Sequence, residues 1–444
     1  MKEKDFSQDF LVKDVEKKEE IRKLGENLSN SRVILSKEAY REFFKKLDNE
    51  EHREFYKNLE SVLEKNDLPS LEKITPHNPY AEITPEDWKI IKKTKQFIVL
   101  HITSLCNSNC NICYEEVCPT QEDMSIQDIK FILSKIGKNK RVSLFGGEPT
   151  VRDDIFEIIK IVRDSGNYPE LYTNGLRLED ENFVKKLKES GIKKVAISFD
   201  GFNERIYKEL RNDSEQYYKK LKALENLQRY NIPTILISLI AEGINDDQIP
   251  ELIKFLKEDI ERKGCIKGIN FYSATPYGKF NVNVEKGLTH LDILKIIEKT
   301  SLGEIKKDYF IEFTKFLINT NKILNRVGIG FPYVGGMCAR FSYENGKLKE
   351  IIPLNEIKDI NKLIEERNIF GVLFKSLKYR KFLEFIDIFD KGKVTDLQYE
   401  KGVYTINIAF IRTPNHTSDY SNIATIAIYK SKEKRYSMAS FAGA

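Results

Sequence analysis

Hydrophobic and polar positions along the chain change their period near residue 97. Before that point, apolar residues recur at three- and four-residue spacing in segments 39–47 and 55–63, which predicts amphipathic helices. The stretch that ends at Trp88 contains three prolines, which favours a linker. We therefore expect residues 1–88 to form a helical extension and linker that packs on the rest of the protein or contacts a substrate.

From residue 97 onward, short apolar runs alternate with helical stretches. The strand-like runs are 97–102, 141–145, 170–173, 194–199, 234–240 and 268–272, and the helical stretches between them are 126–136, 155–164, 181–189, 215–230 and 249–258. Alternation of this kind predicts βαβ units, an α/β fold and a parallel sheet. We assign residues 89–277 to this core and expect its functional residues at the carboxyl ends of the strands.

Beyond residue 277 the alternation stops. The pattern predicts two helices over 289–327, a hairpin around Asn345-Gly346, a helical stretch over 354–390 and two strands within 403–436. We expect this α+β region, residues 278–444, to cover the mouth of the core and to shape a substrate pocket.

Composition and charge exclude several classes of protein. The 444 residues are 41% hydrophobic and 32% charged, as in an ordinary globular protein of two or three domains. The net charge is only +5, and no basic cluster with interleaved aromatic residues predicts nucleic-acid binding. The N-terminus has no apolar signal segment, and the longest apolar run is too short to span a bilayer. Together with the six cysteines, three of which share one loop, these features predict a cytoplasmic location and no transmembrane segment.

Three of the cysteines, Cys106, Cys110 and Cys113, follow the first predicted strand with the spacing C-x3-C-x2-C. Thiolates so placed can hold three irons of a [4Fe–4S] cluster, which normally takes four cysteines, so that one iron stays open for a small molecule. A zinc loop or a chance grouping is the alternative. Zinc would require a fourth cysteine or histidine close by, and His101 lies on the preceding strand.

The C-x3-C-x2-C motif followed by Tyr114 at the end of a first strand resembles the radical SAM superfamily. The resemblance implies a partial (β/α)6 TIM-type barrel whose open iron binds the amino and carboxylate groups of S-adenosylmethionine. One electron from the reduced cluster then cleaves this cofactor to methionine and a 5′-deoxyadenosyl radical. The resemblance also implies a reducing electron donor such as a flavodoxin or a ferredoxin.

Two further motifs of the superfamily follow the second and third predicted strands. The sequence Gly-Gly-Glu-Pro begins at Gly146, and the resemblance implies that it contacts the amino group of the methionine moiety. Glu148 could accept a hydrogen bond from an ammonium group, while Gly146 and Gly147 let backbone approach a ligand closely. Asn174 stands in a Thr-Asn-Gly sequence, which resembles another superfamily motif but is also a favourable tight turn by itself.

The fourth predicted strand leads to further candidate contacts. By resemblance, Ser198 or Asp200 lies near the ribose hydroxyls, and Arg211 pairs with the methionine carboxylate because its fork matches a carboxylate bidentately. Asp200 has the alternative of capping the following helix. Ile112 and Tyr114, which flank the third cysteine, are expected to supply apolar and backbone contacts to adenine.

The remaining cysteines bear on the branch of the superfamily. The chain looks most like the archaeal tetraether-lipid-synthase branch in three places: GGEPTVRDD, the FDG…YKELR stretch and the hairpin around Cys338. Enzymes of that branch join or modify unactivated carbons, and related enzymes methylate pterins. The auxiliary cysteines of that branch are missing, since residues 1–105 contain none. Cys338 is a candidate catalytic hydrogen-atom donor, or alternatively a leftover of a lost metal site. Cys118 and Cys265 are expected to be core or incidental residues.

The sequence therefore predicts a radical SAM enzyme that abstracts hydrogen from a peptide or a small metabolite. Carbon–carbon coupling or methylation of a lipid or a pterin is the alternative outcome. A non-catalytic protein that only binds an iron–sulfur cluster or S-adenosylmethionine is the alternative of another class. GGEP and Arg211 favour the enzyme, because binding a metal requires neither of them.

Overall fold

The computed structural model describes residues 50, 83, 85–93, 97–113, 123–274, 279–282, 288–326, 337–366, 402–410, 425–430 and 436–440. The strands in this part of the chain are β1 (Phe97–Thr103), β2 (Ile112–Cys113), β3 (Arg141–Gly146), β4 (Tyr168–Thr173), β5 (Lys194–Ser198), β6 (Thr234–Ile240), β7 (Ile266–Ser273), β8 (Lys279–Phe280), β9 (Met337–Glu344), β10 (Lys347–Glu350), β11 (Tyr404–Phe410), β12 (Thr425–Lys430) and β13 (Tyr436–Ser440). The α-helices are α4 (Pro85–Lys93), α5 (Ile126–Ile136), α6 (Ile155–Asp164), α7 (Glu181–Ser190), α8 (Glu204–Arg211), α9 (Gln216–Arg229), α10 (Ile249–Glu261), α11 (His290–Thr300), α12 (Lys307–Arg326) and α13 (Leu354–Glu365).

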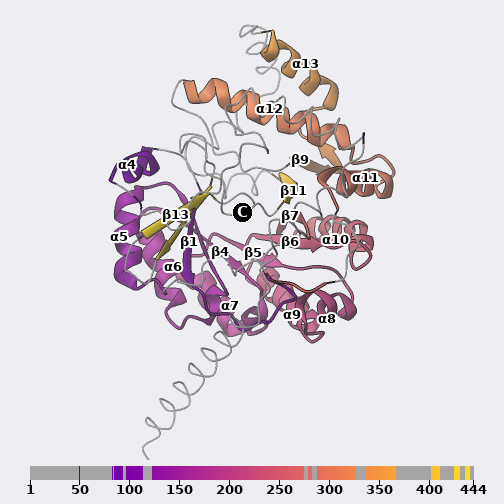
Figure 1. Ribbon diagram of the computed structural model, residues 1–444. Coiled ribbons are helices and arrows are strands. Elements are labelled where there is room, and N and C mark those ends of the chain that lie inside the picture. Colours follow the sequence, from indigo (N-terminus) through magenta and orange to yellow (C-terminus); the bar gives the residue numbers. More distant parts are fainter. Residues whose placement is uncertain are drawn as a thin grey trace, which may run out of the picture.

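Six parallel strands form the centre of the molecule, in the order β1-β3-β4-β5-β6-β7 (Figure 1). Helices connect successive strands of this set and lie on the outside of the curved sheet. The sheet is open, since β10 and β13 form its two edges. This arrangement confirms the predicted α/β fold of the partial (β/α)6 TIM type. None of the described helices combines the length and the apolar character needed to cross a membrane.

Local sequence explains why these elements form. Strand β6 reads TILISLI and is buried along most of its length, as expected for a parallel strand covered on both faces. Helix α5 begins at a capping box, in which Ser125 and Asp128 satisfy each other's backbone amide groups. Helix α6 buries Ile155, Ile158, Ile159 and Val162, the helical spacing that produces one apolar face against the sheet.

The C-terminal region extends the barrel wall. Strand β11 pairs in parallel with β7, and β12 pairs in parallel with β1, so the two strands lie at opposite edges of the core (Figure 1). The sheet therefore continues across the predicted boundary between residues 277 and 278. The predicted helices α11 and α12 are present, as is the β9–β10 hairpin, whose Asn345 and Gly346 both have positive φ.

Two expectations fall partly outside the described residues. The predicted helices in segments 39–47 and 55–63 lie there, as does the helical stretch after residue 366. Helix α4 starts at Pro85, near the end of the proline-containing stretch, and the domain boundary placed after Trp88 stays a prediction.

The inward face of the barrel carries charged residues near the start of several strands. Leu171 and Val195 pack with the helices, so their neighbours Glu170 and Lys194 point to the opposite, inner face. The Glu170 carboxylate accepts hydrogen bonds from Arg141 and pairs with the Lys194 ammonium group at 2.8 Å. Burial alone would raise the pKa of Glu170, but the charges of Arg141 and Lys194 outweigh it and lower the pKa to about 2.

Acid is expected to destabilise the protein through Glu170. The folded state resists protonation of this carboxyl group, whose ordinary pKa is 4.5, so its contribution is present above pH 4.5 and is lost as the pH falls toward 2. The loss amounts to roughly 3 kcal/mol over that window. Urea unfolding of the protein between about pH 5 and pH 3 checks this. Glu170→Gln should show a shallower decline, whereas Glu258→Gln on the outer surface should decline like the wild type. Parallel loss in all three proteins would contradict the assignment.

Candidate active site

The cysteine loop follows β1 and returns through β2, which pairs antiparallel with β8. Cys106, Cys110 and Cys113 are all half-buried free thiols. The Asn111 amide N–H donates to the Leu210 carbonyl at 2.9 Å, and the Asn111 side chain donates to the Glu209 carbonyl at 2.7 Å. These bonds attach the loop to the end of α8, so the thiols lie at the carboxyl end of β1.

The three thiols are near neighbours without converging on one point. Burial and then the neighbouring groups Cys110, Glu148 and Cys113 raise the pKa of the Cys106 thiol. Among the described residues, no three Cys, His, Asp or Glu side chains are gathered closely enough to hold a single ion. In a [4Fe–4S] cluster each thiolate binds a different iron, so such a cluster suits this spread donor set better than zinc does.

The Gly146-Gly147 turn packs on the start of the cysteine loop. The amide N–H of Gly147 donates to the Thr103 carbonyl at 2.9 Å. A Cβ on Gly146 would lie 2.1 Å from the Thr103 carbonyl oxygen, and one on Gly147 would lie 2.4 Å from that of Leu105. The close approach that requires glycine is therefore to the chain's own loop, and the contact of Gly146 and Gly147 with a ligand stays a prediction.

Replacing Gly147 by alanine is expected to displace the cysteine loop, because the new Cβ meets backbone that cannot move aside. We expect a loss of about 2–3 kcal/mol in the free energy of unfolding and less iron bound on reconstitution. Gly303→Ala is the matched control, because Gly303 has a positive φ but no neighbour within 4 Å of a Cβ. That control should cost about 1 kcal/mol and leave iron uptake unchanged. Equal behaviour of the two variants would contradict the packing argument.

Glu148 connects the ends of β3 and β4. Its side chain is buried, with Oε1 accepting hydrogen bonds from Thr150 and from the Thr173 hydroxyl at 2.7 Å. Its Oε2 accepts the Asn174 amide N–H at 2.6 Å. Burial raises the pKa of Glu148, while these hydrogen bonds oppose the shift. Within the described residues Oε2 has this single partner, so it retains a lone pair for a further donor.

Asn174 connects the Thr-Asn-Gly turn to the cysteine loop. Its side-chain amide donates to Asn107 Oδ1 at 2.8 Å and lies 4.0 Å from Cys106 Sγ. Its Oδ1 accepts the Leu176 amide N–H at 3.0 Å, which is the tight-turn interaction that the Asn-Gly pair alone would predict. The residue therefore has both the turn role and a position at the site.

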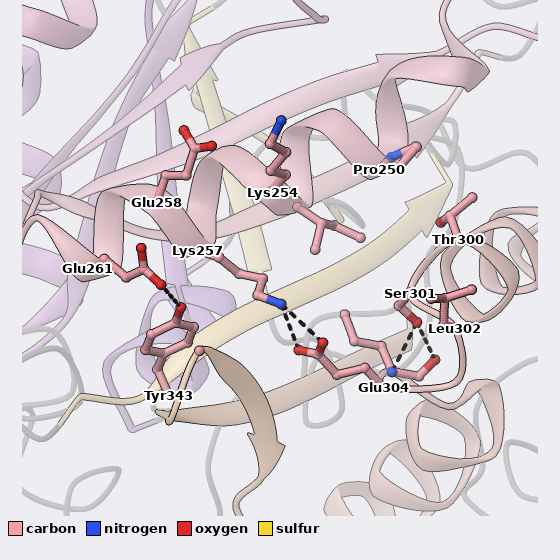
Figure 2. Close-up of a pocket in the computed structure, with 13 residues that line it drawn as sticks. Pro250, Lys254, Lys257, Glu258, Glu261, Thr300, Ser301, Leu302, Glu304 and Tyr343 are labelled. Carbon is pink, nitrogen blue, oxygen red and sulfur yellow. Dashed lines mark hydrogen bonds and ion pairs between the residues drawn. The ribbon is translucent and has the colours of Figure 1, made fainter.

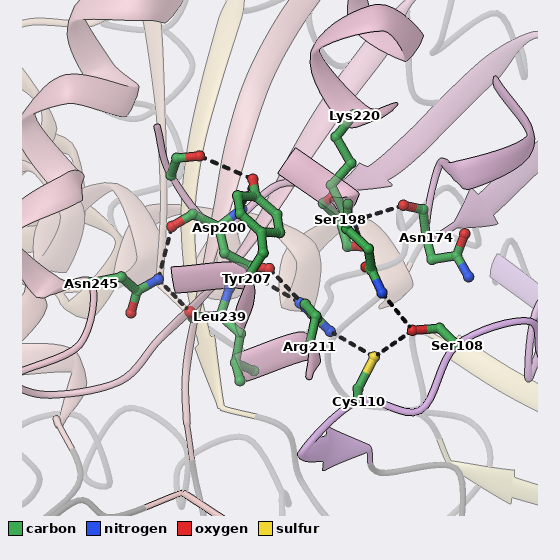
Figure 3. A network of polar contacts seen from close by, with 12 residues as sticks. Ser108, Cys110, Asn174, Ser198, Asp200, Tyr207, Arg211, Lys220, Leu239 and Asn245 are labelled. Carbon is green, nitrogen blue, oxygen red and sulfur yellow. Dashed lines mark hydrogen bonds and ion pairs between the residues drawn. The ribbon is translucent and has the colours of Figure 1, made fainter. Parts of the chain in front are cut away.

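Asp200 and Arg211 form a bidentate ion pair beside the cysteine loop (Figure 3). The two bonds measure 2.7 and 2.9 Å, and the third guanidinium nitrogen, Nη1, lies 3.9 Å from Cys110 Sγ. Asp200 is completely buried and also accepts the Leu239 amide N–H. Its oxygens are thus engaged in holding Arg211 in place. The alternative that Asp200 caps the following helix is wrong, because Asn203 caps α8.

Lys220 is a site residue that sequence reasoning missed. Its side chain is completely buried, and its ammonium group donates to the Asn174 carbonyl, the Ser198 carbonyl and the Ser198 hydroxyl at 2.6–2.9 Å (Figure 3). It forms no ion pair with any residue that the structure describes. Helical spacing places Lys220 one turn before the buried Leu224, and this pattern could have revealed it.

Gln216 lies one turn before Lys220 on the same face of α9. Its side-chain amide donates to the Ser108 hydroxyl at 2.9 Å, and that hydroxyl lies 3.2 Å from Cys110 Sγ. The Gln216 Oε1 atom is buried with no hydrogen-bond partner in the described part of the chain. Helix α9 therefore presents two buried polar side chains to the cysteine loop and to the ends of β4 and β5.

The other predicted residues are distributed more widely. Ile112 is buried in an apolar cluster with Leu239 and Tyr272. Cys338 lies on β9, where its amide N–H donates to Thr314 of α12, and it does not join the cysteine loop. Cys265 is a buried core residue as expected. Tyr114 and Cys118 fall outside the described residues.

A pocket of about 410 Å³ lies on other elements (Figure 2). It is lined by α10, the connection between α11 and α12, and the β9–β10 hairpin. The Lys257–Glu304 ion pair at 3.0 Å and a hydrogen bond from Tyr343 to Glu261 hold its walls. None of the predicted site residues lines it, so we do not assign it to the reaction.

Residues 100–256 match the family model described as the radical SAM superfamily. The chain is 31% identical over 290 residues to the 7,8-dihydro-6-hydroxymethylpterin dimethyltransferase of Methanocaldococcus jannaschii, covering 62% of this chain and 56% of that protein. It is 31% identical over 218 residues to the GTP 3′,8-cyclase of Clostridium perfringens, covering 46% of this chain and 62% of that one. The chain thus spans little more than half the length of these relatives.

Among solved structures, Streptococcus suis SuiB bound to the precursor peptide SuiA is similar with a TM-score of 0.39 and 19% identity, over 47% of this chain and 46% of that one. A likeness at this level supports no further conclusion. The matched superfamily segment begins within β1, runs into α10 and contains the cysteine loop, the GGEP turn and the Asp200–Arg211 pair. On these grounds residues 100–256 form a radical SAM domain, and the cofactors of that superfamily are a [4Fe–4S] cluster and S-adenosylmethionine.

Proposed function

We propose that this protein is an enzyme that cleaves S-adenosylmethionine reductively and abstracts hydrogen from a small metabolite. The observation that carries the proposal is the position of three half-buried thiols at the carboxyl end of β1, beside the guanidinium group of Arg211. Thiolates with a neighbouring cation are the donor set that a cluster with a bound zwitterion requires. A non-catalytic metal-binding protein would require the thiolates but not the neighbouring cation.

The chain's own residues match the parts of S-adenosylmethionine. The free lone pair of Glu148 suits an ammonium group, and the positive charges of Arg211 and Lys220 suit a carboxylate. Ser198 offers a hydroxyl for the ribose, and Ile112 belongs to an apolar cluster suited to adenine. When bound, the reduced cluster supplies the single electron that splits the cofactor into methionine and a 5′-deoxyadenosyl radical.

The substrate class rests on the relatives. Their names specify a pterin and GTP, both of which contain a fused nitrogen heterocycle. We propose a polar small metabolite for this chain, with methylation of a pterin as the alternative outcome. The peptide and lipid substrates considered from sequence stay predictions. A flavodoxin or ferredoxin would supply the electron, and a reducing cytoplasm would preserve the thiols.

Anaerobic reconstitution with iron and sulfide tests the proposed activity. With dithionite and S-adenosylmethionine, we expect about four irons per chain and the formation of 5′-deoxyadenosine. Four irons with intact S-adenosylmethionine would instead support the non-catalytic binding protein. One iron or none, with the cofactor intact, would contradict both the cluster assignment and the activity.

A further inference from the structure

The inner face of β9, β11 and β7 carries a line of polar side chains. Arg340 donates through its NH1 nitrogen to Asn407 Oδ1 at 3.1 Å, and the Asn407 amide donates to Asn270 Oδ1 at 2.7 Å. Asn270 also bonds Tyr272, which packs in the apolar cluster with Ile112. Arg340 must face inward, because the alternate residues of β9 pack against α12, as Phe341 does.

The guanidinium group of Arg340 has no countercharge among the residues that the structure describes. It forms no ion pair with any described residue, and its two hydrogen-bond acceptors are the neutral Asn407 side chain and the Ala339 carbonyl. Its Nε atom is shielded from solvent and has no hydrogen-bond partner in the described part of the chain. Arg340 is half-buried, and a charge that is partly removed from water is normally paired, because an unpaired one lowers the stability of the folded state. A guanidinium group with these properties is expected in an anion-binding site that holds no anion.

Other positively charged side chains inside the barrel add to the positive charge of Arg340. Burial first, and then the charges of Arg141 and Arg340, lower the pKa of Lys194 to about 8, although Glu170 acts in the opposite direction. The charge of Arg340 thus acts on Lys194, although their strands β9 and β5 are four places apart in the sheet. The curvature of the sheet brings the two side chains toward each other across the interior. Glu170 is already shared between Arg141 and Lys194. Glu170 therefore does not compensate the charge of Arg340.

We propose that an anionic group of the substrate, a phosphate or a carboxylate, binds to Arg340 on the inner face of β9. The planar fork of arginine matches both groups, and Asn270 and Asn407 offer hydrogen bonds to neutral parts of the same molecule. This proposal rests on the proposed function in one respect, since it takes the bound anion to be part of the enzyme's substrate.

The strand register shows that such a molecule would reach the cofactor end of the barrel. Arg340 lies opposite Thr405, which is in register with Gly268, four residues before Tyr272. At about 3.3 Å per residue, the Arg340 backbone lies about 13 Å below the level of Tyr272. Cys338 lies between these levels, opposite Asn407. A small metabolite anchored at Arg340 would therefore pass Cys338 on its way to the mouth.

Thermal unfolding of the cluster-loaded full chain tests the proposal without any turnover. The midpoint is measured with inorganic phosphate, pyrophosphate or succinate against sodium chloride of equal ionic strength. We expect one of these anions to stabilise the wild type, phosphates identifying a phosphorylated substrate and succinate a carboxylate. Arg340→Met should raise the apparent Kd for that anion at least tenfold and should raise the anion-free midpoint by about 1–3 °C, since an unpaired charge is removed.

Two further variants keep the result interpretable. Arg262→Met removes the same charge from the surface and should leave the anion response unchanged, since the Arg262 side chain is 66% exposed. Arg340→Lys keeps the charge without the fork and should bind the anion with intermediate affinity. Equal stabilisation of the wild type and Arg340→Met, no stabilisation of the wild type by any of these anions, or a lower anion-free midpoint in Arg340→Met would each overturn the proposal. Because no S-adenosylmethionine is needed, such a failure is distinct from absence of 5′-deoxyadenosine in the cleavage assay.

Discussion

Replacing Cys106, Cys110 and Cys113 together by alanine is expected to abolish both iron binding and the formation of 5′-deoxyadenosine while the barrel stays folded. The effect should be complete, because all three proposed ligands of the cluster are removed at once. The fold should survive because none of the three belongs to a hydrophobic core cluster, and the loop is held through the Asn111 hydrogen bonds.

Three measurements check this variant. Iron per chain and visible absorbance report the cluster, chromatography reports 5′-deoxyadenosine, and far-ultraviolet circular dichroism reports the fold. Cys265→Ala is the matched control, because Cys265 is a buried core thiol far from the cysteine loop in the sequence, and its Sγ atom lies 3.7 Å from the Thr234 hydroxyl. It should lose some stability but keep iron and activity. A triple variant that still formed 5′-deoxyadenosine would refute the proposed mechanism.

Asp200→Asn is expected to lower the free energy of unfolding by about 3 kcal/mol, because it leaves the Arg211 guanidinium without its carboxylate partner. Asp200 is fully buried and the Arg211 side chain is only 13% exposed, so water cannot replace the lost partner. Burial acts against the charge of Arg211, but Asp200 outweighs it and holds the pKa of Arg211 above its ordinary value. We also expect weaker binding of S-adenosylmethionine, because Arg211 would no longer be held in position.

A double variant separates stability from binding. Asp200→Asn combined with Arg211→Met removes both charges and should regain most of the lost stability, yet it should not regain affinity for S-adenosylmethionine. Urea unfolding measures the first quantity and isothermal titration of cluster-loaded protein measures the second. Glu209→Gln, in the exposed pair with Arg205 on the same helix, should change neither. Additive losses in the double variant would show that the pair does not act as a unit.

The local elements of the core were predictable from sequence. Helices α5 and α6 have the predicted bounds, since each has an apolar stripe of helical period and a clear start. Helix α8 was missed, because its eight residues are mostly charged and its cap, Asn203, lies only two residues after Gly201. A helix this short gives too little periodic signal to stand out.

The site was predictable where its residues are close to a strand end. Glu148, Asn174 and Arg211 lie in motifs, and the structure places each beside the cysteine loop or in contact with it. Lys220 and Gln216 lie inside a long helix, and what makes them notable is burial against loops distant in the sequence. A sequence motif does not reveal such a contact, because several residue types could occupy the same helix positions if the helix packed against different neighbours.

By itself the sequence determined the alternation of strands and helices, the spacing of the three thiols and the order of the motifs along the strand ends. These depend on residues near one another in the chain, whose side-chain period and turn chemistry act locally. Only the tertiary structure decided that β11 and β12 extend opposite edges of the barrel, that Asp200 pairs with Arg211, and that Arg340 donates a hydrogen bond to the neutral Asn407 side chain. Those features arise from pairing between residues far apart in sequence, where register and curvature of the sheet choose the partner and local pattern cannot.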